Sequence, residues 1–171
     1  MLEKFYPNEY VESSYIIKYE ELYKKGYRGL LFDIDNTLVG HGLKADERAK
    51  QLFIRLKEIG FGVCLISNNQ EERVRTFNDE VNVKYIFNAH KPSRKGYQRA
   101  MKTIGTNLNN TVFIGDQIFT DVYGANRAGL KTILVKPIHP KEEIQIVLKR
   151  YIEKVVLFFY KKRINKKEKL F

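Results

Sequence analysis

Residues 29–38 read GLLFDIDNTL, an apolar run that ends in two acidic residues two positions apart. Residues 29–34 are predicted to form a strand buried on both faces, because short uninterrupted apolar runs are typical of parallel sheets. Burying Asp33 and Asp35 at the end of such a strand costs free energy unless hydrogen bonds or a metal ion compensate the charges. The pair therefore indicates either a capped turn or a functional site, and the rest of the chain must distinguish the two.

Short apolar runs alternate with segments of helical spacing along the rest of the chain. This alternation predicts right-handed parallel crossovers, and hence a doubly wound, Rossmann-like α/β fold in which helices flank a parallel sheet. Ligands of such sheets bind beyond the carboxyl ends of the strands. The predicted strands are residues 29–34, 61–66, 83–87, 111–114 and 131–136, and the predicted helices are residues 46–59, 70–78, 93–104 and 120–128.

Asp33 and Asp35 have the chemistry that phosphoryl transfer with Mg²⁺ requires. Mg²⁺ prefers oxygen ligands and is usually held by one or two protein carboxylates together with substrate phosphate. Asp33 could give one oxygen to the metal ion and attack phosphorus with the other. Asp35 could protonate the leaving oxygen and later activate water. The end of the first predicted strand is therefore the candidate catalytic segment.

Three further polar segments follow predicted strands. Ser67 and Asn68 follow the second strand, where a hydroxyl and main-chain N–H groups can bind phosphate oxygens, although a serine there is usually a helix cap. Lys91 follows the third strand and offers a positive charge to phosphate and to a nucleophilic carboxylate, although a single lysine is usually solvated. Asp116 and Asp121, in GDQIFTD after the fourth strand, offer further carboxylates or else belong to a capped turn.

The four segments, in the order DIDNTL, Ser67, Lys91 with Pro92, and GDQIFTD, resemble the four motifs of the haloacid dehalogenase (HAD) superfamily across residues 29–136. Over residues 5–138 the chain is similar to the YqeG-type members of its subfamily IIIA. That group is similar in turn to the mitochondrial phosphatidylglycerophosphate phosphatase. The resemblance implies a Mg²⁺-dependent phosphatase.

The resemblance also implies a role for each motif residue. Asp33 is expected to be the nucleophile and a metal ligand, and Asp116 a second metal ligand. Asp35 is expected to be the general acid and base, and to bind the metal ion through its main-chain carbonyl. An acid at position 35 favours phosphoryl transfer over dehalogenation. The remaining expected roles are phosphate binding by Ser67 and Lys91, with support from Thr37 and Asp121.

The gaps between the motifs bear on the substrate. Asp35 and Ser67 are 32 positions apart, and Ser67 and Lys91 are 24 apart, which leaves no room for an inserted domain. HAD cap domains insert at these two points, so the resemblance implies a capless enzyme. An uncovered site suits a bulky substrate, or a partner subunit acting as cover, and favours hydrolysis because water can reach an aspartyl-phosphate.

Length and composition limit the class of protein. The 171 residues suffice for one compact domain, predicted at residues 1–140, and an appendage at residues 141–171. The single cysteine, Cys64, excludes an internal disulfide and is typical of a reducing compartment. The first fourteen residues lack the apolar core of a signal peptide, and the longest apolar run, residues 155–160, is too short for a bilayer span. We therefore expect a cytoplasmic protein, soluble or peripheral to the inner face of the membrane.

The predicted appendage carries +6 of the net charge of +11. Two interpretations are open: a basic amphipathic helix on an anionic membrane, or a helix packed on the sheet with a solvated basic end. Packing is favoured for residues 144–152, and membrane contact for residues 155–160 followed by the basic run at residues 161–169. The apolar positions of the predicted helix are Ile144, Val147, Leu148, Tyr151, Ile152, Val155 and Phe159.

Three functions remain open at this point. The first is a phosphatase of a lipid-linked phosphate monoester, with phosphatidylglycerophosphate converted to phosphatidylglycerol. A second is a phosphatase of a soluble sugar or nucleotide phosphate. A third is a nucleic-acid-associated or ribosome-associated protein that keeps the HAD scaffold for binding. The complete motif set argues against the third, as does the fact that the aromatic residues of the tail are clustered and not interleaved with basic ones. The sequence leaves the oligomeric state open.

Overall fold

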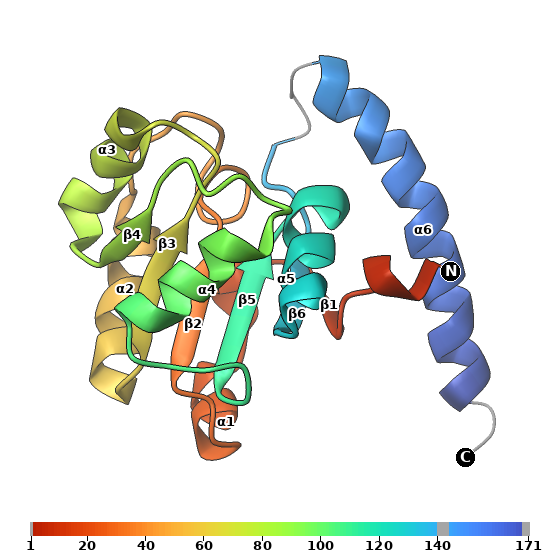
Figure 1. The fold of residues 1–171 in the computed structure, drawn as a ribbon, viewed down its shortest axis with the longest axis horizontal. Coiled ribbons are helices and arrows are strands. Elements are labelled where there is room, and N and C mark those ends of the chain that lie inside the picture. The colour runs from red at the N-terminus through yellow and green to blue at the C-terminus, as the bar shows by residue number, and fades with distance from the viewer. Residues whose placement is uncertain (1, 140–143, 169–171) are drawn as a thin grey trace.

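The structure is a computed structural model that describes residues 2–139 and 144–168. Within these ranges, parallel strands form one sheet in the order β1-β6-β5-β2-β3-β4 (Figure 1). The strands are β1 (Glu9–Val11), β2 (Gly29–Phe32), β3 (Gly62–Ile66), β4 (Lys84–Ile86), β5 (Thr111–Gly115) and β6 (Lys131–Val135). The α-helices are α1 (Tyr19–Lys24), α2 (Glu47–Ile59), α3 (Glu71–Val81), α4 (Arg94–Thr103), α5 (Tyr123–Ala128) and α6 (Ile144–Glu168). The shorter helical turns are η1 (Leu2–Phe5), η2 (Ser14–Ile16) and the π-helical turn η3 (Ile118–Val122).

The predicted doubly wound α/β fold is confirmed, with one strand more than the sequence analysis contained. The additional strand, β1, pairs with β6 at the edge of the sheet, with Glu9 opposite Ile133. It has three residues, all half-buried, and so lacks the apolar run that identified the other strands. The helix predicted at residues 120–128 starts earlier and in a different form, as η3 followed by α5.

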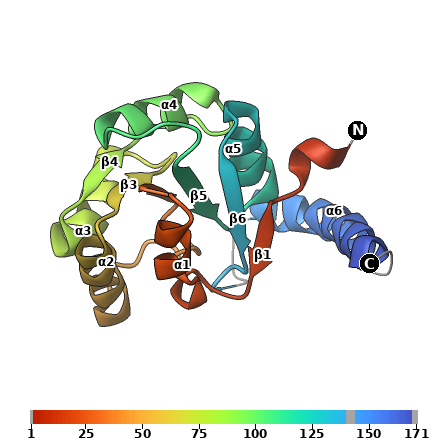
Figure 2. The same cartoon turned by 90° about the horizontal axis from the view of Figure 1, so that it is seen from below.

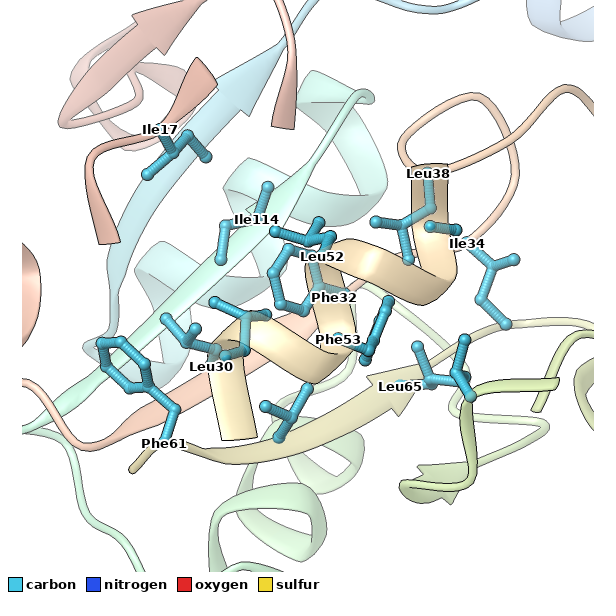
Figure 3. Packing of buried hydrophobic residues seen from close by; sticks show 14 of the residues in the cluster. Ile17, Leu30, Phe32, Ile34, Leu38, Leu52, Phe53, Phe61, Leu65 and Ile114 are labelled. Atoms are coloured by element: carbon cyan, nitrogen blue, oxygen red, sulfur yellow. The ribbon is translucent and has the colours of Figure 1, made fainter. Parts of the chain in front are cut away.

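The sheet lies between two layers of helices (Figure 2). Because side chains alternate along a strand, Leu30 and Phe32 of β2 point to one face and Leu31 to the other. Leu30 and Phe32 belong to the core that includes Phe53 of α2 (Figure 3). Leu31 belongs to a second core that includes Tyr97 of α4. Strand β2 lies between β3 and β5 and is parallel to both. Its carboxyl end therefore places Asp33 near the middle of the edge at which the strands end.

The helix ends are set by local chemistry that the sequence displays. Asp46 caps α2 by accepting a hydrogen bond at its side chain from the main-chain N–H of Ala49, 2.8 Å away. Gly60 ends the same helix in the left-handed region, with a φ of 104° that favours glycine. The chain then enters β3, which delivers Ser67 to the same edge of the sheet as Asp33.

No domain is inserted between β2 and β3 or between β3 and β4, where the chain forms α2 and α3 respectively. The absence of a cap, expected from the gaps between the motifs, is thus borne out by the described residues. None of the helices in the described ranges combines the length and the apolar content that a bilayer crossing needs.

Helix α6 lies beside η1 and η3, next to the edge of the sheet (Figure 1). The expectation that Tyr151 and Ile152 would pack on the sheet is wrong, since both side chains are exposed. The buried face of α6 instead contains Glu153, Val156 and Tyr160. Because the buried face includes the charged residue Glu153, a prediction from the spacing of apolar residues alone chose the exposed face of α6. Residues 140–143 and 169–171 of the predicted tail, and the side chains of Ile144, Val147 and Leu148, lie outside the described residues.

Candidate active site

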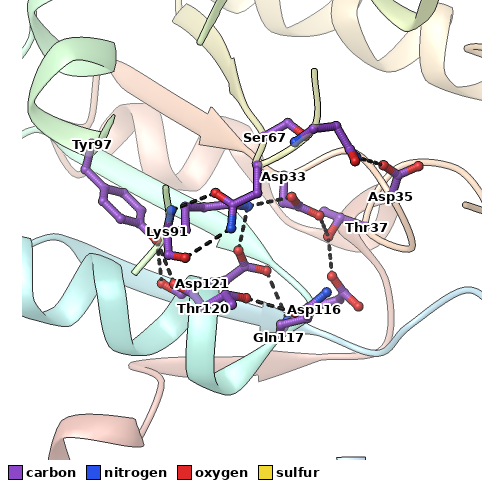
Figure 4. A network of polar contacts seen from close by, with 12 residues as sticks. Asp33, Asp35, Thr37, Ser67, Lys91, Tyr97, Asp116, Gln117, Thr120 and Asp121 are labelled. Carbon is purple, nitrogen blue, oxygen red and sulfur yellow. Dashed lines mark hydrogen bonds and ion pairs between the residues drawn. The ribbon is translucent and has the colours of Figure 1, made fainter. Parts of the chain in front are cut away.

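Asp33 is the first residue after β2 and lies at the centre of a buried polar network (Figure 4). Its main-chain N–H donates to the Ile114 carbonyl of β5 at 2.9 Å, which continues the strand pairing up to the site. Its Oδ1 accepts a hydrogen bond from Lys91 Nζ at 2.6 Å, and its Oδ2 lies 3.2 Å from Thr37 Oγ1. Burial raises the pKa of Asp33 to about 7, although the Lys91 ammonium opposes the rise.

Lys91 lies between two carboxylates. Its Nζ is 2.6 Å from Oδ1 of Asp33 and 2.7 Å from Oδ1 of Asp121, and its side chain is almost completely buried. Burial by itself lowers the pKa of Lys91, but the two acids outweigh it and raise the pKa above the usual range. The ammonium is therefore charged at neutral pH and directed at Asp33.

Asp116 and Asp121 come from the segment after β5. The Thr37 hydroxyl lies 3.2 Å from Asp116 Oδ1, and the Gln117 main-chain N–H donates to Asp121 Oδ2 at 3.1 Å. A Cβ on Gly115 would lie 2.6 Å from Asp121 Oδ2, so glycine is required for this carboxylate to approach the end of β5. Burial and the neighbouring acids raise the pKa of Asp116 well above its usual range.

The buried acids fit a divalent cation. Asp33, Asp116 and Asp121 each offer a carboxylate oxygen, and these oxygens lie within 4.8 Å of one another. Close buried carboxylates repel one another, and Lys91 is the cation shared by two of them. Oxygen-only ligands of this kind match the preference of a hard ion such as Mg²⁺.

Asp35 points away from this cluster (Figure 4), and Arg73 of α3 contacts it. Its Oδ1 accepts hydrogen bonds from Gly42 N at 2.8 Å and from Arg73 Nη2 at 2.7 Å. Its Oδ2 accepts from Asn69 Nδ2 at 2.7 Å. The side chain is thus held at a distance from the three clustered acids by Gly42, Asn69 and Arg73.

Ser67 and Asn68 follow β3 as expected, but their side chains make structural contacts in the described state. Ser67 Oγ accepts a hydrogen bond from Asn69 N at 3.1 Å. The Asn68 amide binds the main chain of Lys91 from both sides, accepting from its N–H at 2.6 Å and donating to its carbonyl at 3.0 Å. Asn68 therefore holds the segment that carries the lysine, a contact that was not predicted from the sequence.

Other residues at the site were missed from the sequence. Arg73 contacts Asp35 from α3, and Arg150 of α6 donates from Nη1 to the Asp116 carbonyl at 2.7 Å. Neither arginine stands in a recognisable motif. Their contacts depend on how α3 and α6 are rotated against the sheet, and apolar spacing alone did not reveal this. Tyr97 of α4, a core residue, also donates from its hydroxyl to the main-chain carbonyl of Thr120 at 2.9 Å.

Comparison with known proteins agrees with this geometry. The family model described as HAD-hydrolase-like matches residues 88–143. The chain is 36% identical over 165 residues to a probable phosphatase, YqeG, of Bacillus subtilis, covering 95% of this chain and 96% of that protein. It is 25% identical over 170 residues to phosphatidylglycerophosphate phosphatase 1, chloroplastic/mitochondrial, of Arabidopsis thaliana, covering 94% of this chain and 48% of that protein.

Solved structures support the fold. A HAD superfamily (subfamily III A) hydrolase from Legionella pneumophila, described as putative, superposes with a TM-score of 0.52 at 23% identity. The match covers 71% of this chain and 72% of that one. At this level of identity the likeness concerns the fold alone.

Proposed function

Because this chain belongs to the haloacid dehalogenase superfamily, as a YqeG-type phosphatase, we propose that it hydrolyses phosphate monoesters with Mg²⁺ through an aspartyl-phosphate on Asp33. The observation that carries the proposal is the environment of Asp33. One carboxylate oxygen is paired with the buried Lys91 ammonium and the other lies beside Thr37 and Asp116. A nucleophile held at both oxygens is oriented before substrate arrives.

The proposed reaction has two steps. Asp33 attacks phosphorus, the bond from phosphorus to the leaving oxygen breaks, and Asp35 gives that oxygen a proton. Asp35 then takes a proton from water, which attacks the phosphoaspartate and releases inorganic phosphate and Asp33. Lys91 stabilises the negative charge of the transferring group. The metal ion, held by Asp33, Asp116 and the main-chain carbonyl of Asp35, would neutralise carboxylate and phosphate charge during transfer.

Phosphate binding is proposed for the segment after β3. Ser67 ends a buried strand, and its hydroxyl can turn from Asn69 N to a phosphate oxygen, because a hydroxyl both donates and accepts. The main-chain N–H of Ser67 donates to the Ile86 carbonyl at 3.0 Å, so the main-chain N–H of Asn68 would complete the binding with Lys91. Asp121, which shares the lysine with Asp33, keeps the ammonium in place between turnovers.

For the substrate we propose a lipid-linked monoester, phosphatidylglycerophosphate. Two observations support it. The Arabidopsis relative bears that substrate in its name, and no inserted domain covers the site within residues 2–139 and 144–168. An uncapped site can act on a headgroup that stays attached to a bilayer. A cap domain that closes over the site would keep such a headgroup out.

The outer face of α6 is the surface we propose for contact with an anionic membrane. Its exposed side chains include Tyr151, Val155 and Phe158. The basic segment at residues 161–163 follows them along the helix, and each basic residue near an anionic surface contributes about 1 kcal/mol. Apolar residues that can enter the interface and cations that attract the lipid headgroups are therefore adjacent on one helix.

One experiment tests both parts of the proposal. Phosphate release is measured from phosphatidylglycerophosphate in anionic vesicles and from soluble sugar and nucleotide phosphates, with Mg²⁺ or with EDTA. We expect Mg²⁺-dependent release from the lipid, and none with Asp33→Asn. Release that survives Asp33→Asn would show that the mechanism is wrong. Preference for a soluble ester would overturn the lipid assignment while leaving the phosphatase intact.

Vesicle flotation tests the membrane contact separately. Phe158→Ser with Phe159→Ser removes two exposed aromatic rings from α6. Ile54→Ser is the matched control, since Ile54 is an exposed apolar residue on α2. We expect only the double variant to lose flotation with anionic vesicles. Equal flotation of all three proteins would exclude α6 as the contact surface.

A further inference from the structure

Helix α6 reaches the candidate active site through two side chains one helical turn apart. Arg150 donates from Nη1 to the main-chain carbonyl of Asp116 at 2.7 Å, and from Nη2 to Oδ2 of the same residue. Nη1 also donates to Oε2 of Glu153 at 2.9 Å. Oε1 of Glu153 accepts a hydrogen bond from the main-chain N–H of Ile118 at 2.8 Å. The helix thus holds both the main chain and the carboxylate of the segment that follows β5.

These contacts are shielded from water. The side chain of Asp116 is fully buried, and those of Arg150 and Glu153 are 17% and 7% exposed. Buried ion pairs contribute little net stability, because removing the charges from water offsets their attraction. Arginine is suited to orienting a carboxylate, since its planar guanidinium donates in a fixed two-pronged geometry that lysine cannot reproduce.

The two oxygens of Asp116 have different partners. Arg150 contacts Oδ2, whereas the Thr37 hydroxyl lies 3.2 Å from Oδ1 and also 3.2 Å from Oδ2 of Asp33. Oδ1 is therefore the oxygen beside the nucleophile. The guanidinium fixes the plane of the carboxylate from Oδ2 and leaves Oδ1 on the side of Asp33.

We propose that Arg150 is a positioning residue that holds Asp116 in the orientation in which it binds the divalent metal ion. The inference rests on the proposed function, which assigns Asp116 to the metal. Its consequence is that α6 completes the active site. The domain predicted at residues 1–140 would then need a side chain from the predicted appendage at residues 141–171 to orient its metal ligand.

Direct titration with Mn²⁺ tests the inference on the full chain. The electron paramagnetic resonance signal of free Mn²⁺ reports the unbound metal, and so gives a Kd without any substrate. We expect Arg150→Gln to raise the Kd about 10–100-fold, the usual effect of removing a partner that orients a metal ligand. Arg150→Lys keeps the charge and should recover part of the affinity. Lys149→Gln, an equal charge loss at an exposed neighbour, should bind as the wild type does.

The variants separate the possible outcomes. Asp116→Asn should abolish binding; if it binds Mn²⁺ as the wild type does, or the wild type binds none, the proposed metal site itself is wrong. If Asp116→Asn loses the metal but Arg150→Gln binds with unchanged or tighter affinity, the positioning role alone is overturned. Melting temperatures of the metal-free proteins identify a variant that fails to fold. Should Arg150→Gln fail in that way, Arg150→Lys decides: weakened binding supports the inference, and wild-type binding overturns it.

Discussion

Lys91 and Asp33 lie 58 positions apart in the chain, yet the lysine Nζ is 2.6 Å from the aspartate Oδ1. Strand β3 lies between β2 and β4, and all three strands are parallel. The segment after β2, which contains Asp33, and the segment after β4, which contains Lys91, therefore begin at the same edge of the sheet. The ammonium also binds Asp121, so one buried cation serves two buried acids. One positive charge does not neutralise two carboxylates, so the free-energy cost of burying Asp33 is only partly offset.

The first prediction concerns stability. Burial raises the pKa of Asp33 from its usual 3.8 to about 7, so the folded metal-free protein holds a proton that the unfolded chain releases. The stability that the folded state gains from this proton is complete below about pH 4 and is lost as the pH rises toward 7. Asp33→Asn lacks this loss. Relative to the wild type it should gain on the order of 3 kcal/mol in unfolding free energy between pH 5 and pH 8.

Urea denaturation in EDTA at the two pH values measures this gain. Asp79→Asn, an exposed acid on α3, is the control and should show no pH-dependent gain. If the stability of Asp33→Asn relative to the wild type does not rise between pH 5 and pH 8, the unfavourable burial of the nucleophile is contradicted.

The second prediction concerns the leaving group. If Asp35 protonates the leaving oxygen, Asp35→Asn should reduce kcat for an alkyl phosphate by about 10²–10⁴-fold. The loss should be much smaller for formation of the phosphoenzyme from p-nitrophenyl phosphate, because nitrophenolate departs without a proton. The measurement is the burst of nitrophenolate in rapid mixing, compared with steady-state release from the alkyl ester. Equal losses for both substrates would assign Asp35 a binding role instead.

The third prediction concerns Cys64. Its side chain is buried in β3, and burial raises its pKa to about 12, so the thiolate that reacts with disulfide reagents is scarcely populated at neutral pH. We expect no reaction of the folded protein with a chromogenic aromatic disulfide. One equivalent should react in guanidinium chloride, which serves as the internal control. Rapid modification of the folded protein, with activity lost in parallel, would indicate that the strand opens readily.

The central sheet was predictable because its strands are buried on both faces, which leaves short apolar runs in the sequence. The positions of Asp33, Lys91 and Asp116 followed from the same topology, since parallel strands deliver the segments after them to one edge. Strand β1 was not predictable by that route, because its three residues Glu9–Val11 are half-buried at the edge of the sheet.

Side-chain contacts between distant elements were not predictable from spacing. The apolar stripe that includes Tyr151 and Ile152 predicted the wrong buried face for α6, because Arg150 and Glu153 turn the helix toward the acidic segment after β5. An arginine and a glutamate three positions apart look the same in the sequence whether their side chains are solvated or, like those of Arg150 and Glu153, buried against another segment. Only the packing of the helix on the sheet distinguishes the two.

The last prediction concerns the packing of Gly124 beside the segment that carries Lys91. A Cβ on Gly124 would lie 2.5 Å from the Tyr97 hydroxyl oxygen and 2.9 Å from the Cα of Pro92, the residue after the lysine. Gly124→Ala should therefore cost about 1–3 kcal/mol of unfolding free energy in urea. Tyr97→Phe removes the hydroxyl but leaves the ring carbon Cε2, which would lie 2.8 Å from the added Cβ, and the main chain of Pro92. The cost of Gly124→Ala should therefore be smaller, though not zero, in that background. The same cost in both backgrounds would mean that the hydroxyl of Tyr97 plays no part in keeping this position a glycine.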